Sequence, residues 1–347
     1  MPAMESRRTN DCQLEFPSDP MKWFICRIAS TVLASILLAE LCIGQAPAPK
    51  GDGSVSVVVL VTVLTKKSTA PAEIQKEDII VREGGVRKPI EAWVPAREDH
   101  ASLQLAIVID EASRRDLGSQ YQSLKKFITS QPPSSSIGIY FALGNSLRPA
   151  VQLTTDHNAA VKSLRPPLGD FGNLVGPYSA VSQLIDGWPI TLARREILFL
   201  TPGFDLIHRE RYSSDMRAVI EEAQRSGIVV HPIMVNSPYP RLTAYSEIAR
   251  SNLTELADET GGASLVGALA PPLSMPEETG GSPIRDTIPI LDLGPVLKSL
   301  GTVLENQYFL VWKTTPSKNK NGELRSFSVQ AEDRNLRLTA PAKVFVP

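Results

Sequence analysis

Oxygen-bearing side chains gather where the sequence predicts the end of a buried strand. Asp110 directly follows the apolar run Leu105–Ile109. Further carboxylates and a hydroxyl lie in the next loop and in a later one: Glu111, Ser113, Asp116 and Asp205. Such oxygens are the ligands that Mg²⁺ prefers, but carboxylates at strand ends also serve as solvated caps. The residues therefore leave open both a divalent-cation site and a structural cap.

The familiar catalytic patterns are missing from the sequence. The histidines are scattered without the spacing of a metal site: His100, His157, His208 and His231. No phosphate-binding glycine loop follows a predicted strand, and no Gly-x-Ser-x-Gly motif supplies a nucleophile. Asp205 and His208 are close in sequence but lack a serine partner on a strained turn. We therefore expect a protein that is not an enzyme and that uses no cofactor.

Apolar runs predict the buried strands that would position these side chains. They are Leu105–Ile109, Ile137–Leu143, Ile197–Leu200 and Ile228–Val235. Unbroken runs are typical of parallel strands covered on both faces. Helical patterns alternate with them: Asp116–Ser130, Asn158–Leu164, Tyr178–Ile185, a helix capped by Ser214 or Asp215 and closed by Gly227, and Ile248–Thr260. The alternation predicts an α/β domain with a parallel, Rossmann-like sheet over residues 103–265.

β-rich segments flank this predicted domain on both sides. Residues 51–98 contain the runs Ser54–Thr65, Ile79–Arg82 and Ile90–Val94, with Gly84-Gly85 as a hairpin signal between the last two. After a Pro/Gly-rich loop at 266–290, residues 291–347 predict a helix and further strands, among them Tyr308–Lys313, Ser326–Ala331, Leu336–Thr339 and Lys343–Val346. We expect the two β-segments to pack together as one module beside the α/β domain.

The amino-terminal residues have the pattern of an export signal. Lys22 and Arg27 flank the start of the apolar stretch Ile28–Leu38, and small residues follow it. This pattern is typical of a secretory signal peptide, so residues 1–46 are predicted to be a signal peptide and leader, with no membrane span remaining after cleavage. All 3 cysteines lie in this segment, namely Cys12, Cys26 and Cys42. The mature chain would therefore contain no thiol. We expect a secreted, periplasmic or envelope location.

Charge and composition narrow the range of partners. The formal net charge of the 347 residues is -1, so no basic footprint indicates nucleic acid. The pair Arg194-Arg195 is interpreted as solvated charge beside a strand. His231 falls inside a predicted strand and is interpreted as a hydrogen-bonded core residue. Trp188 is interpreted as an aromatic side chain buried under a loop.

The ordered set of these segments resembles a von Willebrand factor type A domain. The matching stretches are LQLAIVIDEAS, ILFLTPG, IVVHPIMV and LADETGG. The whole mature chain is similar to the acidobacterial-type VWFA-related proteins, which also have segments like Glu77–Ile90 and Asn306–Thr314. The resemblance spans roughly Ser54 to Pro347, and it implies the Rossmann-like fold expected above.

The first loop of the metal-ion-dependent adhesion site of such domains is altered in this chain. The family pattern is Asp-x-Ser-x-Ser, and Asp110 matches the aspartate. Ala112 replaces the first serine and Arg114 the second. Alanine supplies no side-chain oxygen, and a guanidinium would repel a cation. We expect Arg114 to pair with Asp110 in the place of the metal.

The other two loops of that adhesion site depart from the family pattern as well. The second loop, at residues 169–176, offers Asn173 but no threonine, and the third has Pro202-Gly203 where the family has an aspartate, with Asp205 shifted. The resemblance thus implies a degenerate site, and Mg²⁺ is possible but disfavoured. The vestigial site would consist of Asp110, Ser113 and Asp205. The open alternative is a shifted metal site made from Asp110, Glu111, Ser113, Asp116 and Asp205.

The resemblance and the lost ligands together suggest a role in protein interaction. We expect an adhesion-like, non-enzymatic protein that binds a protein or a cell-envelope partner without metal. The candidate contacts are Asp110, Ser113, Arg114, Asn173, Thr201 and Asp205. The alternative is a structural scaffold subunit of an envelope assembly, held through open sheet edges. Fold alone does not establish either function.

Overall fold

The computed structural model describes residues 53–67, 69, 71, 74–98, 102–170, 176–189, 191, 193–205, 213–237, 243–265 and 291–347. The predicted signal peptide, the Pro/Gly-rich loop at 266–290 and Asn173 lie outside these residues. Among the helices of the described residues, none has both the length and the apolar character needed to cross a bilayer.

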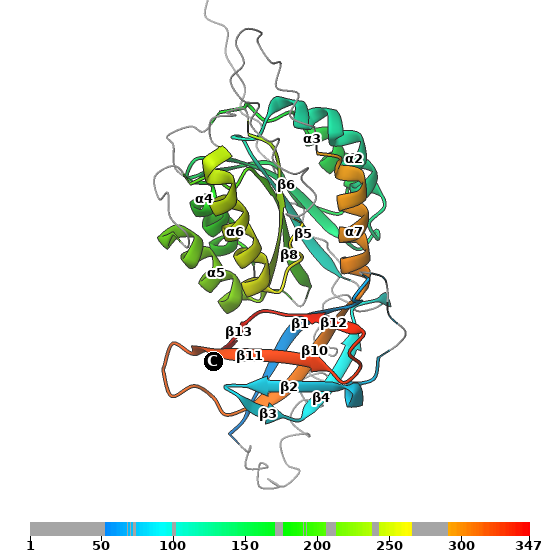
Figure 1. Cartoon of the computed structure of the whole chain (residues 1–347), viewed down its shortest axis with the longest axis vertical. Helices are drawn as coiled ribbons and strands as arrows, with labels where there is room; N and C mark the ends of the chain where they lie inside the picture. The colour runs from blue at the N-terminus through cyan, green and yellow to red at the C-terminus, as the bar shows by residue number, and fades with distance from the viewer. Residues whose placement is uncertain are drawn as a thin grey trace, which may run out of the picture. The chain divides into compact units, whose positions relative to one another are not determined.

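A five-stranded sheet forms the centre of the α/β part, in the order β7-β6-β5-β8-β9. The strands are β5 (Leu103–Asp110), β6 (Ser136–Leu143), β7 (Ser146–Thr154), β8 (Arg194–Thr201) and β9 (Ile228–Met234). Strand β5 pairs in parallel with β6 and β8, and β8 pairs in parallel with β9. The predicted α/β class is confirmed, and β5 lies in the middle of the sheet (Figure 1).

The edge strand β7 corrects the prediction of a purely parallel sheet. It pairs antiparallel with β6, and the register shifts near Ile139. Its side chains are mostly exposed or half-buried, and Pro149 lies inside it. Proline is tolerated in a strand only at a sheet edge or a bulge. Because this segment has a proline and no continuous apolar pattern, its sequence did not predict a strand.

Helices cover both faces of the five-stranded sheet, as Figure 1 shows. The helices are α2 (Tyr121–Thr129), α3 (His157–Ser163), α4 (Tyr178–Asp186), α5 (Ser214–Ser226), α6 (Thr243–Thr260) and α7 (Leu293–Glu305). Ala106 and Val108 of β5 pack on one face with α4, α5 and α6. Leu105, Ile107 and Ile109 pack on the other face with α2 and α7. Because successive strand residues point to opposite faces, this double burial explains the unbroken apolar run.

Several helix boundaries differ from those predicted; α6, for example, begins at Thr243 and not at Ile248. The segment expected as one helix from Asp116 begins as the 3-10 helix η4 (Arg115–Gln120) and becomes α2 only at Tyr121. Helix α5 is capped by Ser213, whose hydroxyl accepts a hydrogen bond from the Met216 N–H, rather than by Ser214 or Asp215. These differences of position leave the order of the elements unchanged.

The terminal β-segments form two four-stranded sheets with the orders β12-β1-β10-β4 and β13-β11-β2-β3. The strands are β1 (Val55–Thr65), β2 (Ile79–Glu83), β3 (Val86–Lys88), β4 (Ile90–Pro95), β10 (Gln307–Thr314), β11 (Glu323–Ala331), β12 (Leu336–Thr339) and β13 (Lys343–Val346); η2 (Lys76–Asp78) is a 3-10 turn before β2. Strands from both ends of the chain pair directly, β1 with β10 and β2 with β11. We call these two sheets the β-module.

The hairpin at Gly84-Gly85 joins different strands from those predicted. Strand β2 pairs with β3, whereas β4 pairs with β10 in the other sheet. Pro89 lies between β3 and β4, where the chain passes from one sheet to the other. Between the sheets, Trp312 and Phe327 stack with ring centroids 5.0 Å apart and belong to one apolar core.

Polar side chains join the α/β part to the β-module. Arg194 and Arg195 are buried, so their interpretation as solvated charges is wrong. Arg194 donates to the Leu304 carbonyl at 2.8 Å and to the side chain of Gln307 in β10.

The fully buried His231 contacts Glu196 at 2.6 Å, so its interpretation as a hydrogen-bonded core residue is confirmed. Trp188 is also buried.

Candidate functional site

Asp110 is buried at the carboxyl end of β5, and both of its carboxylate oxygens accept hydrogen bonds. Oδ1 accepts from the Ala112 N–H at 2.9 Å, and Oδ2 accepts from the Thr201 hydroxyl at 2.6 Å. The Thr201 Oγ1 in turn accepts from the Gly203 N–H at 2.9 Å. Because β5 and β8 are parallel neighbours, their ends bring Asp110 and Thr201 together at one edge of the sheet.

The environment of Asp110 makes its ionised form more costly than it is in water. Burial raises the pKa of this carboxyl to about 6, and the charge of Glu111 raises it further, whereas the hydrogen bonds from Thr201 and Ala112 oppose the rise. A desolvated carboxylate is costly unless donors compensate for the lost water. The two hydrogen bonds that Asp110 accepts therefore offset only part of the cost of burying its charge.

Arg114 does not pair with Asp110. Its guanidinium forms an ion pair with Asp116 at 2.5 Å, and both side chains are about one third exposed, at 28% and 30%. The Arg114 N–H donates to the Asn236 carbonyl at 2.9 Å, which ties this loop to the segment after β9. The predicted Arg114–Asp110 pair is therefore wrong, and Arg114 with Asp116 lies at the rim of the site.

Glu111 has a structural partner that sequence reasoning missed. Arg165 forms an ion pair and a second hydrogen bond with its buried carboxylate, and the Leu168 N–H donates to Oε2 at 2.7 Å. The same guanidinium lies 3.7 Å from the centroid of the Phe141 ring. Glu111 thus anchors the loop after α3 and is not available as a metal ligand. The two residues are 54 positions apart, and no motif links them.

Buried hydroxyls without a hydrogen-bond partner lie on the same side of the fold. Within the described residues, they include Ser113 Oγ, Tyr178 OH and Ser179 Oγ. Burial raises the pKa of Tyr178, and the charges of Asp205 and Asp110 raise it further, so this ring lies near both carboxylates. A Cβ on Gly176 would lie 2.9 Å from the Asp205 side chain. The segment just before α4 therefore packs closely against Asp205.

The residues present do not fit the metal site of type A domains. Both oxygens of Asp110 are used by donors of the protein. Glu111 is bound to Arg165, and Asp116 to Arg114, so neither completes the shifted site considered above. Within the described residues, no group of three or more His, Cys, Asp or Glu side chains is arranged to hold a metal ion. Of the candidates, Asp110 and Thr201 contact each other, Asp205 lies near Tyr178, and Ser113 is buried close by in sequence.

Comparisons with known proteins find similar solved structures but no related sequence. No family model matches the chain, and no curated protein matches it. An aerotolerance-related membrane protein from Bacteroides fragilis is 13% identical with a TM-score of 0.39, covering 58% of this chain and 98% of its own. The ArnB paralog VWA2 from Sulfolobus acidocaldarius is 10% identical with a TM-score of 0.36. The match covers 85% of this chain and 75% of the paralog.

A third similar structure is the pilus adhesin SpaC from Lactobacillus rhamnosus GG. It is 10% identical with a TM-score of 0.40, covering 79% of this chain and 42% of its own. Scores and identities this low assign neither a family nor a function. The α/β assignment of this chain rests on its own strand order and registers, with β5 at the centre and helices on both faces.

Proposed function

We propose that the chain is a secreted or envelope-associated, non-enzymatic interaction protein. Its loops at the carboxyl edge of the five-stranded sheet would bind a protein or cell-envelope partner without a metal ion. The observation that carries the proposal is the Asp110 carboxylate, both of whose oxygens are occupied by Ala112 and Thr201. These donors compete with a cation for the carboxylate, and Ala112 supplies no ligand oxygen beside it.

The same contacts fix the loop surface that the proposed binding needs. The loop after β5 is held by the Asp110–Ala112 and Arg114–Asn236 hydrogen bonds, and the loop after β8 by the Thr201–Gly203 bond. A fixed loop surface at the carboxyl ends of strands is the usual ligand position in open α/β sheets. The half-buried Arg114–Asp116 pair gives this surface one charge of each sign, which suits a polar protein partner.

Calorimetric titration tests the metal-independent part of the proposal. Mg²⁺, Mn²⁺ and Ca²⁺ are titrated separately into the purified chain and into the Asp110→Ala variant. We expect no saturable heat from either protein, because Ala112 supplies no ligand oxygen and the neighbouring carboxylates Glu111 and Asp116 are bound to Arg165 and Arg114. Saturable binding by the wild-type chain that is lost in the variant would overturn the proposal and indicate a rebuilt metal site.

Capture from envelope extracts tests the binding surface. The wild-type chain should retain the same partner with a chelator present as with Mg²⁺ present. Asp116→Lys breaks the pair with Arg114 and should abolish retention. Glu221→Lys is the matched control because it breaks an equivalent exposed pair with Arg225, at 2.8 Å, on α5. Unchanged retention by Asp116→Lys would contradict the proposed surface and favour the scaffold role instead.

A further inference from the structure

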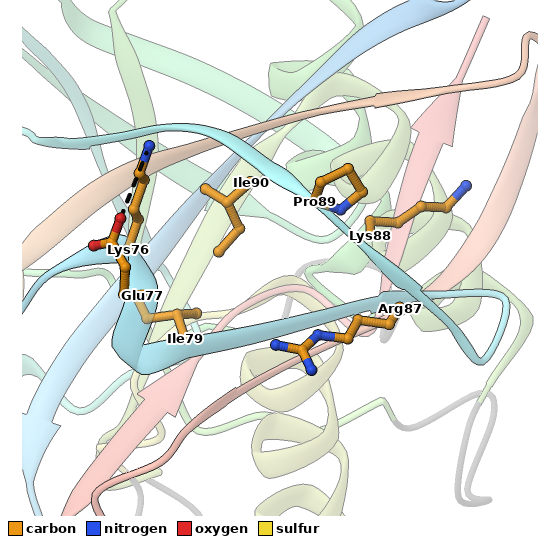
Figure 2. A pocket seen from close by; sticks show the side chains of 7 residues that line it. All are labelled: Lys76, Glu77, Ile79, Arg87, Lys88, Pro89 and Ile90. Carbon is orange, nitrogen blue, oxygen red and sulfur yellow. Dashed lines mark ion pairs between the residues drawn. The ribbon is translucent and has the colours of Figure 1, made fainter.

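The β-module has an open pocket of about 500 Å³ beside the corner at which the chain leaves β3 for β4. Three cationic side chains line it: Lys76, Arg87 and Lys88. One carboxylate, that of Glu77, lies among them. Ile79, Pro89 and Ile90 supply apolar lining (Figure 2). Cations beside an apolar surface are suited to a ligand that has both an anionic and an apolar group.

The three cations are not equally available to a ligand. Lys88 donates to the Thr314 hydroxyl at 3.0 Å and lies 3.8 Å from the buried carboxylate of Glu83. Figure 2 shows its ammonium pointing away from the other labelled side chains. Lys76 lies 4.0 Å from Glu77, and both side chains are at least half exposed, at 50% and 70%. An exposed pair at this distance contributes little, so Lys76 can turn to a ligand.

Arg87 is the cation with the strongest reason to bind an anion. In the β2–β3 register it stands directly opposite Arg82, and like charges in that position repel each other. Arg82 donates to the neutral Gln330 side chain at 3.4 Å. Within the described residues, neither guanidinium has a carboxylate partner. A ligand carboxylate would relieve this repulsion and could accept two parallel hydrogen bonds from Arg87.

The strand next to the pocket offers a backbone contact as well. Strand β3 is the last strand of its sheet and pairs with β2 alone. Val86 on this strand is 62% exposed, one of the few large apolar side chains of the described residues with such exposure. An open strand edge with an exposed apolar side chain is a template on which an extended peptide can add.

We propose that this pocket and the edge of β3 bind an extended, acidic peptide segment of a partner protein. A carboxylate side chain of the peptide pairs with Arg87, and a neighbouring apolar side chain lies against Pro89 and Ile90. The apolar lining and the free strand edge favour a peptide over a small inorganic anion, which would use neither. This surface is separate from the sheet-edge loops, so the inference does not depend on the function proposed above.

Fluorescence anisotropy on the full chain tests the inference with a labelled synthetic peptide of alternating glutamate and valine. We expect saturable binding that weakens at least about tenfold in Arg87→Glu. Arg217→Glu on α5 is the matched control, because it makes the same charge change at another exposed arginine, and it should bind like the wild type. A peptide of alternating lysine and valine should not bind.

Three outcomes would overturn the inference. Equal binding by the wild type and Arg87→Glu would place the peptide elsewhere. Displacement of the bound peptide by inorganic phosphate at equal concentration would make the site a simple anion site. Binding of the wild type to anionic phospholipid vesicles but not to the peptide, with the vesicle binding lost in Arg87→Glu, would make it a membrane contact. Both arginines are exposed, so we expect both variants to fold. Thermal unfolding of the two variants checks this.

Discussion

At the scale of single residues, the Asp110 carboxylate is a charge that the fold tolerates at a cost. Its pKa is raised to about 6 by burial, against an ordinary value of 3.8. A carboxyl whose folded-state pKa is raised binds a proton more tightly in the folded than in the unfolded protein. Ionised Asp110 therefore destabilises the fold above pH 6, and the penalty is relieved as the pH falls toward 3.8.

Asp110→Asn should remove this pH dependence. We expect the free energy of unfolding of the variant, relative to that of the wild type, to be more favourable at about pH 7.5 than at about pH 4, by the order of 3 kcal/mol. Urea denaturation at the two pH values measures the difference. Thr201→Ser, which keeps the hydroxyl donor to Asp110 Oδ2, is the control and should keep the shape of the wild-type pH profile. Parallel pH profiles for Asp110→Asn and the wild type would contradict the assignment.

Sequence reasoning reached this residue but not its environment. Asp110 and Thr201 could be placed at one edge because parallel strands end together. The partner of Glu111 could not be predicted, because Arg165 comes from a loop whose path depends on tertiary packing. The burial of Arg194 and Arg195 was missed for a related reason: the strand they begin meets another module, which its own composition does not reveal.

At the scale of elements, two glycines with positive φ show how loop geometry and helix packing combine. Gly203, after β8, has a φ of +72°, and an added Cβ would lie 2.8 Å from the buried Leu253 side chain and 3.3 Å from Ala249. Gly227 ends α5 with a φ of +64°, and an added Cβ would meet nothing within 4 Å. Only the first glycine is required for packing as well as for backbone conformation.

We therefore expect Gly203→Ala to destabilise the protein more than Gly227→Ala. The second substitution carries only the strain of a left-handed residue, about 1 kcal/mol. The first adds overpacking against α6, for a total of about 2 to 4 kcal/mol. Chemical denaturation of the two variants at neutral pH measures both free energies. Equal losses would show that α6 can shift away from the loop after β8.

The elements themselves were largely predictable where a strong pattern exists. The strand β13 and the run at β5 follow apolar patterns that their burial explains. Strand β7 has a mostly exposed pattern and an internal proline, so only its pairing with β6 defines it. The hairpin partner of β2 was missed because β3 has only three residues and two of them are exposed. Pairing across the module, rather than local sequence, decides these strands.

At the scale of the whole described unit, a buried polar network joins the five-stranded sheet to the β-module. Glu196 of β8 accepts from the Gln307 side chain of β10 at 3.0 Å and contacts His231 Nε2 at 2.6 Å. The Ala263 N–H donates to His231 Nδ1 at 2.9 Å, so the ring proton is on Nε2 and points to Glu196. Three elements of two sheets thus share one carboxylate.

The pKa of Glu196 gives this network its pH dependence. Burial alone would raise the pKa, but hydrogen bonds from His231 and Gln307 and the charge of Arg194 hold it below the ordinary value of 4.5. A depressed folded-state pKa contributes stability above the unfolded value, which is lost as the pH falls through the folded one. The network therefore stabilises the joined modules at neutral pH, and this contribution is lost progressively as the pH falls below 4.5 through the lowered folded-state pKa.

Gln307→Leu tests the network, because it removes a donor to Glu196 and an acceptor for Arg194 without changing charge. We expect the free energy of unfolding to fall by about 2 to 3 kcal/mol at neutral pH, since the variant leaves buried polar groups without partners. The loss should shrink as the pH falls below 4.5 and through the lowered pKa of folded Glu196. Gln330→Leu on β11 is the control: the residue type and module are the same, but the side chain is exposed, so its effect should be within about 0.5 kcal/mol. If the two variants lost equal stability at neutral pH, the Glu196 network would not be what holds the five-stranded sheet to the β-module.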